Sequence, residues 1–248
     1  MIAAIPDGAG DEGGRVLNIA HRGASSRFPE NTLAAFQGAI DAGADMCELD
    51  VQLSRDGALV VIHDDTVDRT TGGRGAVAAM TLEQLKRLDA GVSFGAEFKG
   101  ERIPTLDEVF ACVGGRCALN IELKSAGLEQ KVCATIRDHD ALATAIVSSF
   151  DWDALDRIWQ FHPAVRVGLL ASRWPVRLLG AATAIKACAI HPRVDIVTED
   201  LCTAAHERIL DVYTWTVDDL DTMRKLIAYG VDGIMTNYPE RLRMLMER

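Results

Sequence analysis

The sequence lacks any concentrated run of lysine or arginine. Its 26 basic residues are outnumbered by 36 acidic ones, and the formal net charge is −10. Because proteins that bind a phosphate backbone need a basic stripe or patch, we expect neither nucleic acid nor an anionic membrane surface as a partner. A phosphate-bearing substrate would have to be held by a few local charges, and this favours a small molecule in a pocket.

Membrane-spanning and targeting segments are also lacking. No stretch approaches the roughly 18 apolar residues of a membrane span. No basic residue precedes Arg15, whereas a signal or transit peptide would carry one near its start. We therefore expect a cytoplasmic protein without stable membrane association. The acidic, glycine-rich start of the chain predicts that residues 1–15 form a flexible tail.

Closely spaced cysteine pairs are absent as well. None of the six cysteines stands in a Cys-x-x-Cys arrangement, and a chain of 248 residues buries enough core to need no disulfide staple. The cysteines are therefore predicted to be reduced, structural thiols.

The sequence does contain an alternation of strand-like and helix-like segments from Val16 onward. This pattern is typical of a parallel sheet wrapped by helices. Eight repeats of it favour a closed (β/α)8 TIM barrel, an α/β fold that often spans about 250 residues as one domain. We expect that domain over residues 16–248. The predicted strands are 16–20, 45–53, 117–123, 144–148, 166–170, 194–198, 210–215 and 233–236.

Two local patterns refine this prediction. The first helix is predicted to be capped by Asn31 and to end at Gly43. The connection between the second and third predicted strands, residues 58–116, is too long for a plain loop. An insertion is therefore expected there, at roughly residues 64–104.

Acidic side chains occupy one face of two neighbouring predicted strands. Glu48 and Asp50 share a face of the second strand by two-residue alternation, and Glu122 and Lys124 share a face of the third. Carboxylates this close need a nearby cation to ionise together. Oxygen-only ligands suit Mg²⁺ or Ca²⁺ better than zinc. Two half-exposed antiparallel strands would alternate in the same way, but the helices between these strands do not suit hairpins.

Two histidines are predicted at strand ends. His21 ends the first strand and His63 follows the apolar run 59–62, so both could lie at the rim where barrel enzymes work. Imidazoles transfer protons near neutral pH, and Arg22 adds a cation suited to an anionic substrate. A lone strand-end histidine is usually structural, yet its co-occurrence with the acidic cluster points to a metal-assisted phosphodiester hydrolase. The remaining histidines are predicted to be surface or capping residues: His139, His162, His191 and His206.

The motifs of the chain, taken in order, resemble those of glycerophosphodiester phosphodiesterases. The similarity runs from about Asn18 to Pro239, nearly the whole chain, and the ordered series is highly specific. The matching segments are His21-Arg22-Gly23, Pro29-Glu30-Asn31-Thr32, Glu48-x-Asp50, His63-Asp64, Arg69-Thr70-Thr71-Gly72, Ile103-Pro104-Thr105-Leu106, Glu122-x-Lys124, Trp215-Thr216 and Thr236-Asn237-Tyr238-Pro239.

This resemblance implies a (β/α)8 barrel with a small insertion after the second strand, and it implies roles for the candidate residues. Glu48, Asp50 and Glu122 would hold one divalent cation, Mg²⁺ or Ca²⁺. His21 and His63 would serve as general acid and base.

The resemblance also implies how the substrate is held. Arg22 and Lys124 would neutralise phosphate charge, Glu30 would be a supporting ligand or an orienting group, and Trp215 would form a wall for the glycerol end. The chain departs from the family at Asp218, where the family often has Asn, and this bears on the shape of the rim near Trp215.

The implied reaction is metal-dependent hydrolysis of a small glycerophosphodiester, such as glycerophosphocholine or glycerophosphoethanolamine, to sn-glycerol 3-phosphate and an alcohol. The attacking group would be the glycerol 2-hydroxyl, which gives a cyclic phosphate, or water. Two alternatives stay open: a lysophospholipase D-like activity, which predicts an apolar groove at the mouth, and a non-catalytic phosphate-binding barrel.

Overall fold

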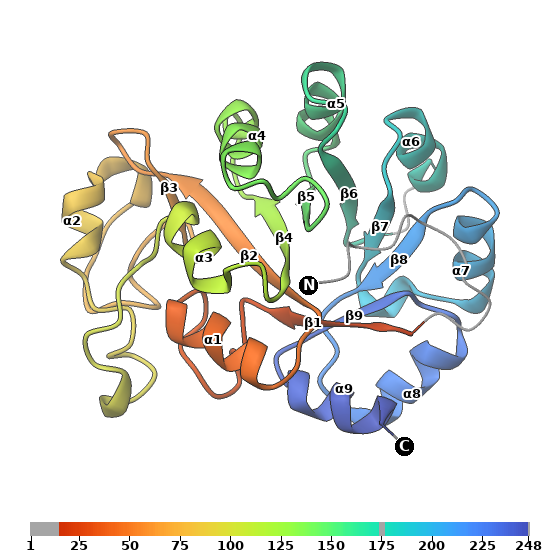
Figure 1. Cartoon of the computed structure of the whole chain (residues 1–248), viewed down its shortest axis with the longest axis horizontal. Helices are drawn as coiled ribbons and strands as arrows, with labels where there is room; N and C mark the ends of the chain where they lie inside the picture. Colours follow the sequence, from red (N-terminus) through yellow and green to blue (C-terminus); the bar gives the residue numbers. More distant parts are fainter. Residues whose placement is uncertain (1–14, 174–176, 248) are drawn as a thin grey trace.

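The strands of the computed structural model close into a ring that is surrounded by helices (Figure 1). The structure describes residues 15–173 and 177–247. Neighbouring barrel strands pair in parallel, and β1 pairs with both β2 and β9, which closes the ring. The predicted TIM barrel is therefore confirmed. Its strands are β1 (Leu17–His21), β2 (Met46–Leu53), β4 (Ala118–Leu123), β5 (Ala145–Ser149), β6 (Arg166–Ala171), β7 (Ala189–Pro192), β8 (Asp211–Thr214) and β9 (Gly233–Thr236).

Helices cover the outside of the barrel, and several begin at a side chain that caps their first turn. Asp151, Thr198 and Asp219 each accept a hydrogen bond from a backbone N–H of the helix that follows, which satisfies a donor that would otherwise lack a partner. The outer helices are α1 (Leu33–Asp41), α3 (Leu106–Val113), α4 (Glu129–Asp138), α5 (Trp152–Phe161), α6 (Leu178–Ala184), α7 (Glu199–His206), α8 (Leu220–Ala228) and α9 (Pro239–Met246).

Two apolar clusters hold the barrel together. One lies between the sheet and the helices and includes Leu49, Ile121 and Leu155. The other fills the inside of the barrel with side chains from seven of the strands, among them Met46 and Tyr213. Because the barrel interior is packed rather than open, polar side chains that project inward can meet only near an end of the strands.

A separate group of elements lies between β2 and β4. It contains β3 (Leu59–Val61), which runs antiparallel to β2, the short helices η1 (Val77–Ala79) and η2 (Ala96–Phe98), and α2 (Leu82–Lys86). These elements enclose a small apolar cluster of their own. The long connection between the strands therefore has secondary structure and a local core.

The prediction of a strand at residues 194–198 is wrong. The strand is β7, whereas Val194–Ile196 forms the short helix η3. β-Branched residues at 194–198 favour extended structure locally, and Pro192 argues against a strand because it has no N–H. β7 still forms because it is paired on both sides, with β6 and β8, and because Pro192 is its last residue.

The predicted cap of the first helix is displaced by one position. Thr32, not Asn31, caps α1, and its hydroxyl accepts from the backbone N–H of Ala35. Asn31 has a left-handed backbone with φ of 57°. Its amide is directed elsewhere, because it binds a carboxylate of β2.

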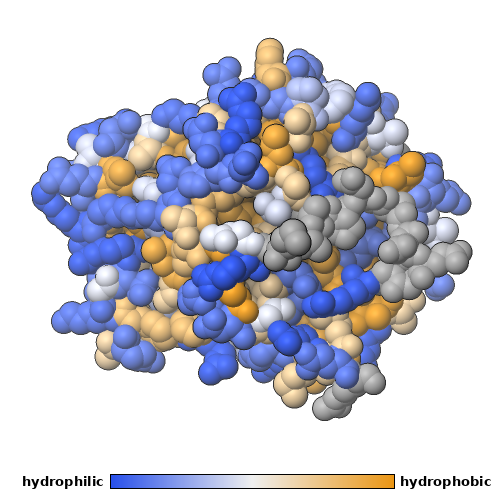
Figure 2. Space-filling view, viewed as in Figure 1, coloured by the Kyte–Doolittle hydropathy of each residue, from blue (hydrophilic) through white to orange (hydrophobic). Residues whose placement is uncertain are grey.

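The surface is mostly hydrophilic on the face shown in Figure 2, with apolar residues scattered among the polar ones. In the part of the chain that the structure describes, no helix has the length and apolar character needed to cross a bilayer. Of the predicted tail, residues 1–14 lie outside the described residues. Its last residue, Arg15, forms an ion pair with Asp45.

Replacing Gly23 by Ala should destabilise the fold by roughly 2–4 kcal/mol, from backbone strain and overpacking together. Gly23 has φ of +81°, and a Cβ there would lie 2.6 Å from the backbone carbonyl carbon of Ala35. Chemical unfolding measures the loss. Gly180→Ala is the control: a Cβ at this exposed glycine of α6 would meet no heavy atom within 4 Å, so its variant should unfold like the wild type or later. Equal losses in the two variants would contradict the account.

Candidate active site

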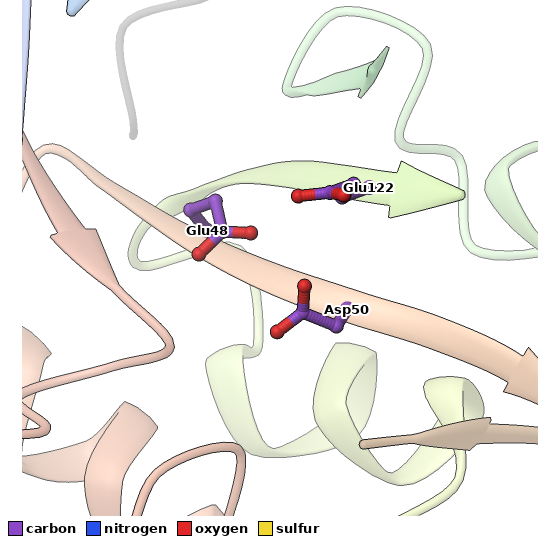
Figure 3. Close-up of side chains that lie close together, drawn as sticks. All are labelled: Glu48, Asp50 and Glu122. Atoms are coloured by element: carbon purple, nitrogen blue, oxygen red, sulfur yellow. The ribbon is translucent and has the colours of Figure 1, made fainter. Parts of the chain in front are cut away.

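Three carboxylates gather inside the barrel at the point predicted from strand alternation. Glu48 and Asp50 project from β2 and Glu122 from β4 (Figure 3), and one oxygen of each lies within 4.8 Å of the others. The register pairs Asp50 with Glu122 across the two parallel strands. Glu48 and Asp50 are buried, and Glu122 is partly buried. The backbone pairing of two strands thus brings together ligands that lie far apart in the sequence.

The negative charges of the three carboxylates are only partly offset by positively charged groups of the protein. Burial and the neighbouring Asp50 and Glu122 raise the pKa of Glu48 well above its ordinary value of 4.5. Burial and Asp50 likewise raise the pKa of Glu122. Among the described residues, the buried Oδ1 atom of Asp50 accepts no hydrogen bond, and its nearest cation is Lys124 Nζ at 3.6 Å. Three carboxylates, one of them with an oxygen that lacks a hydrogen bond, fit a hard divalent cation, and the cluster can hold one.

Two cations flank the carboxylates. Arg22 donates its backbone N–H to Glu48 at 3.0 Å, and its Nε lies 3.3 Å from Asp50. Lys124 donates to Glu122 at 2.8 Å and lies 3.6 Å from Asp50. Both predicted phosphate-binding residues therefore lie directly beside the acidic cluster.

His21 faces the carboxylates with one nitrogen and a fixed acceptor with the other. Its Nε2 lies 4.0 Å from Glu48, and its Nδ1 lies 2.8 Å from Oδ1 of Asn237. Asn237 donates its side-chain and backbone N–H groups to Asp218. Because a carboxylate only accepts, Asn237 must turn its oxygen toward His21, so Nδ1 carries the proton and Nε2 is free to accept one. Burial and the charge of Arg22 lower the pKa of His21.

His63 lies just beyond a strand end, as the apolar run 59–62 predicted, but the strand is not one of the parallel barrel strands. His63 follows β3, which folds back along β2 so that Ile62 donates its N–H to the carbonyl of Asp50 at 3.0 Å. The Nδ1 of His63 lies 2.7 Å from Asp64. The hydrogen bond from Arg69 lowers the pKa of Asp64. The antiparallel hairpin, not the barrel, places this imidazole.

Glu30 lies between two arginines. It accepts from Arg22 at 2.9 Å and twice from Arg69 at 2.8 Å. Burial alone would raise the pKa of Glu30, but the hydrogen bond from Arg69 and the charge of Arg22 outweigh it and lower the pKa to about 2. Glu30 is thus placed to orient Arg22.

Trp215 follows β8 and is partly buried. Its indole N–H donates to the backbone carbonyl of His191 at 2.7 Å. Its ring meets Phe150, which follows β5, edge-on with centroids 5.7 Å apart. An aromatic pair therefore joins the ends of two distant strands.

Asn31 is the clearest site residue that sequence reasoning misassigned. Its amide donates to Asp50 at 2.8 Å and its oxygen faces the backbone N–H of Asp50 at 3.4 Å. Asn tolerates a left-handed backbone better than most residues, so the same residue makes the turn and holds the carboxylate. The motif Glu30-Asn31-Thr32 was the available signal.

The prediction that His191 is a surface or capping residue is wrong. It lies in β7 and is fully buried, and burial lowers its pKa to about 3. Neither ring nitrogen has a hydrogen-bond partner among the described residues. Its ring occupies the space that a Cβ at Gly168 would need, so the glycine makes room for it. The prediction is confirmed for His139 and His162, which are the C-caps of α4 and α5. His206 is the last residue of α7, partly buried, and its Nε2 lies 2.9 Å from Asp232.

The chain is similar to known proteins over nearly its whole length. The model of the glycerophosphoryl diester phosphodiesterase family matches residues 21–241. A glycerophosphodiester phosphodiesterase of Caldanaerobacter subterraneus subsp. tengcongensis is 43% identical over 240 residues, which cover 94% of this chain and 99% of that protein. A Bacillus subtilis protein of the same name is 34% identical over 91% of this chain and 85% of its own length.

Solved structures show the same likeness. A phosphodiesterase of Oleispira antarctica, solved in complex with the product sn-glycerol-3-phosphate, superposes with a TM-score of 0.86 at 31% identity and covers 93% of this chain and 96% of its own. A glycerophosphodiester phosphodiesterase of Thermotoga maritima gives a TM-score of 0.78 at 29% identity, over 94% of this chain and 99% of its own.

The raised pKa values predict that the metal-free protein loses stability as the pH rises. Above about pH 4.5 the unfolded carboxyls are ionised, whereas folded Glu48 and Glu122 keep their protons up to their higher pKa values. The native state binds more protons in that window, so stability falls there, by about 1.4 kcal/mol per pH unit for each proton. Urea unfolding in EDTA at several pH values measures the slope.

Glu48→Gln should flatten this slope, because it removes one of the raised groups. Glu83→Gln, at an exposed position on α2, is the matched control and should unfold with the wild-type slope. An unchanged slope in Glu48→Gln would contradict a raised pKa of Glu48.

Proposed function

The chain belongs to the glycerophosphoryl diester phosphodiesterase family and is a hydrolase of glycerophosphodiesters, and we propose that the site at the barrel mouth performs this reaction with His21 and His63 as proton carriers. The observation that carries the proposal is the acidic cluster. One carboxylate oxygen of each of its three residues lies within 4.8 Å of the others, and Arg22 and Lys124 lie beside it. This arrangement suits a divalent cation and a phosphodiester bound side by side.

Glu48, Asp50 and Glu122 would hold one divalent cation, Mg²⁺ or Ca²⁺. When bound, it would withdraw charge from the phosphate and from an adjacent hydroxyl. Arg22 and Lys124 would bind the phosphate oxygens, since both side chains already lie against the carboxylates. Their fixed charges favour a small anionic substrate.

We assign His21 as the general base. Its Nε2 is the free acceptor because Asn237 holds the proton on Nδ1, and its lowered pKa keeps the ring neutral near pH 7. Nε2 would take the proton of the attacking hydroxyl, which frees its oxygen to form a bond to phosphorus.

His63 is then the general acid. Asp64 binds its Nδ1, so Nε2 is the nitrogen available to protonate the departing alcohol as its bond to phosphorus breaks. With the glycerol 2-hydroxyl as attacking group, the product of this step is a cyclic phosphate, which water opens with the two histidines in reversed roles. With water as attacking group, a single step gives glycerol 3-phosphate.

Further assignments complete the proposal. Glu30 would orient Arg22, and Trp215 would form a wall against the glycerol end, which its place beside the strand ends supports. Residues 16–248 would act as one domain, with residues 64–104 as an insertion that has its own apolar cluster. A small-molecule substrate, with no nucleic acid and no stable membrane association, fits the net charge of −10. The cytoplasmic location stays a prediction.

Purified protein should release glycerol 3-phosphate from glycerophosphocholine or glycerophosphoethanolamine, and EDTA should abolish the release. A coupled assay with Mg²⁺ or Ca²⁺ restored separately measures both turnover and metal preference. No turnover of either substrate with either metal would refute the proposal. An analogue without the 2-hydroxyl separates the two routes, because only direct attack by water would cleave it.

His21→Ala and His63→Ala should each retain less than about 1% of wild-type kcat, in line with loss of a general base or acid. The change in kcat is measured at saturating substrate. His139→Ala, a C-cap of α4 on the surface, should keep wild-type turnover. Near-wild-type activity in either active-site variant would show that its imidazole is structural.

A further inference from the structure

Arg69 lies outside the proposed catalytic set and makes an unusually complete set of contacts. It belongs to the segment between β3 and η1, and its side chain is about half exposed. Its Nε and Nη2 donate to the two oxygens of Asp64 at 2.7 and 3.0 Å. Its Nη1 and Nη2 donate to the two oxygens of Glu30, both at 2.8 Å. One guanidinium therefore makes two bidentate pairs.

The two carboxylates that Arg69 joins each contact a residue of the proposed machinery. Asp64 also binds Nδ1 of His63 at 2.7 Å. Glu30 also binds Arg22 at 2.9 Å. Arg69 thus forms the middle of a continuous chain of hydrogen bonds from the imidazole of His63 to the guanidinium of Arg22, and through Arg22 to Asp50 at 3.3 Å.

These hydrogen bonds determine how firmly the imidazole of His63 is held. The imidazole is 31% exposed and follows a strand of only three residues, so backbone packing alone holds it weakly. Asp64 determines which ring nitrogen faces the site only if its own carboxylate is held still. Bidentate pairing to a planar guanidinium holds a carboxylate in both position and plane.

Exposed ion pairs add little to stability, and Arg69 is exposed enough that its contacts should matter for orientation more than for folding. The imidazole of His21 is held differently from that of His63. His21 is held by Asn237 and Asp218, which follow barrel strands. In the part of the chain that the structure describes, the insertion thus holds the imidazole of His63 through hydrogen bonds, whereas the imidazole of His21 is held from the barrel.

From these contacts we propose that Arg69 is a positioning residue that acts through Asp64 to keep Nε2 of His63 facing the substrate, and through Glu30 to keep Arg22 beside Asp50. This rests on the proposed function of His63 and Arg22. It gives the inserted segment a part in the reaction without any contact between Arg69 and the substrate.

The test is a double-mutant cycle. Arg69→Ala should lower kcat by about 10- to 100-fold, the range seen when a hydrogen-bond partner that orients a metal ligand is removed, with KM changed less than about threefold. In an Asp64→Asn background the same change should cost less than in the wild type, because the path to His63 is already broken and only the path through Glu30 remains. Arg69→Lys should recover part of the loss, since lysine keeps the positive charge but cannot form the two bidentate pairs.

A readout independent of activity is the tautomer of His63. At a pH high enough to make the His63 ring neutral, long-range ¹H–¹⁵N spectra of ¹⁵N-histidine-labelled wild type should show its remaining proton on Nδ1, and those of Arg69→Ala should show a mixture of tautomers. His21 should be unchanged in both proteins. If the wild type proves inactive on glycerophosphodiesters, the proposed function fails, and these spectra still decide whether Arg69 orients His63.

Arg87→Ala is the matched control, because this arginine of the same insertion pairs with Glu83 at the exposed surface. It should leave kcat and the His63 signal unchanged. Wild-type kcat in Arg69→Ala, additive losses in the cycle, or a loss of kcat with an unchanged His63 spectrum would each overturn the proposal.

Discussion

Three carboxylates held close together inside the barrel, two of them buried and one partly buried, are the constraint on which the rest of the site depends. Neighbouring parallel strands force Glu48, Asp50 and Glu122 into one small volume, where burial and mutual repulsion favour protonation. Only a cation resolves this conflict while leaving the carboxylates charged. Arg22 and Lys124 supply part of the positive charge. A divalent ion would supply the rest between the three carboxylates, where Oδ1 of Asp50 accepts no hydrogen bond from the described residues.

The groups around this cluster divide into two supporting systems. His21 is held from the barrel through Asn237 and Asp218, and the direction of those hydrogen bonds determines which nitrogen is protonated. His63 is held by Asp64 from the hairpin that follows β2. The two imidazoles therefore receive different environments from different parts of the chain, which is what a base and an acid require.

Much of the site could be predicted because it follows from short-range rules. Two-residue alternation places Glu48 and Asp50 on one face, and parallel pairing brings Glu122 beside them. The contacts that orient these groups could not be predicted in the same way. Asn237 meets His21 across 216 residues of chain and Arg69 meets Glu30 across 39, and no local periodicity encodes such pairs. β7 and His191 were misassigned because burial between neighbouring strands outweighs local preference there.

Calorimetric titration of the metal-free protein with Mg²⁺ and with Ca²⁺ tests the central claim most directly. We expect one site per chain and release of protons on binding at a pH below the raised pKa values of Glu48 and Glu122, because both groups keep their protons there when no cation is present. Asp50→Asn should weaken binding at least about tenfold, in the range seen when a residue of a metal site is altered. No saturable binding by the wild type, or equal binding by Asp50→Asn, would contradict the account.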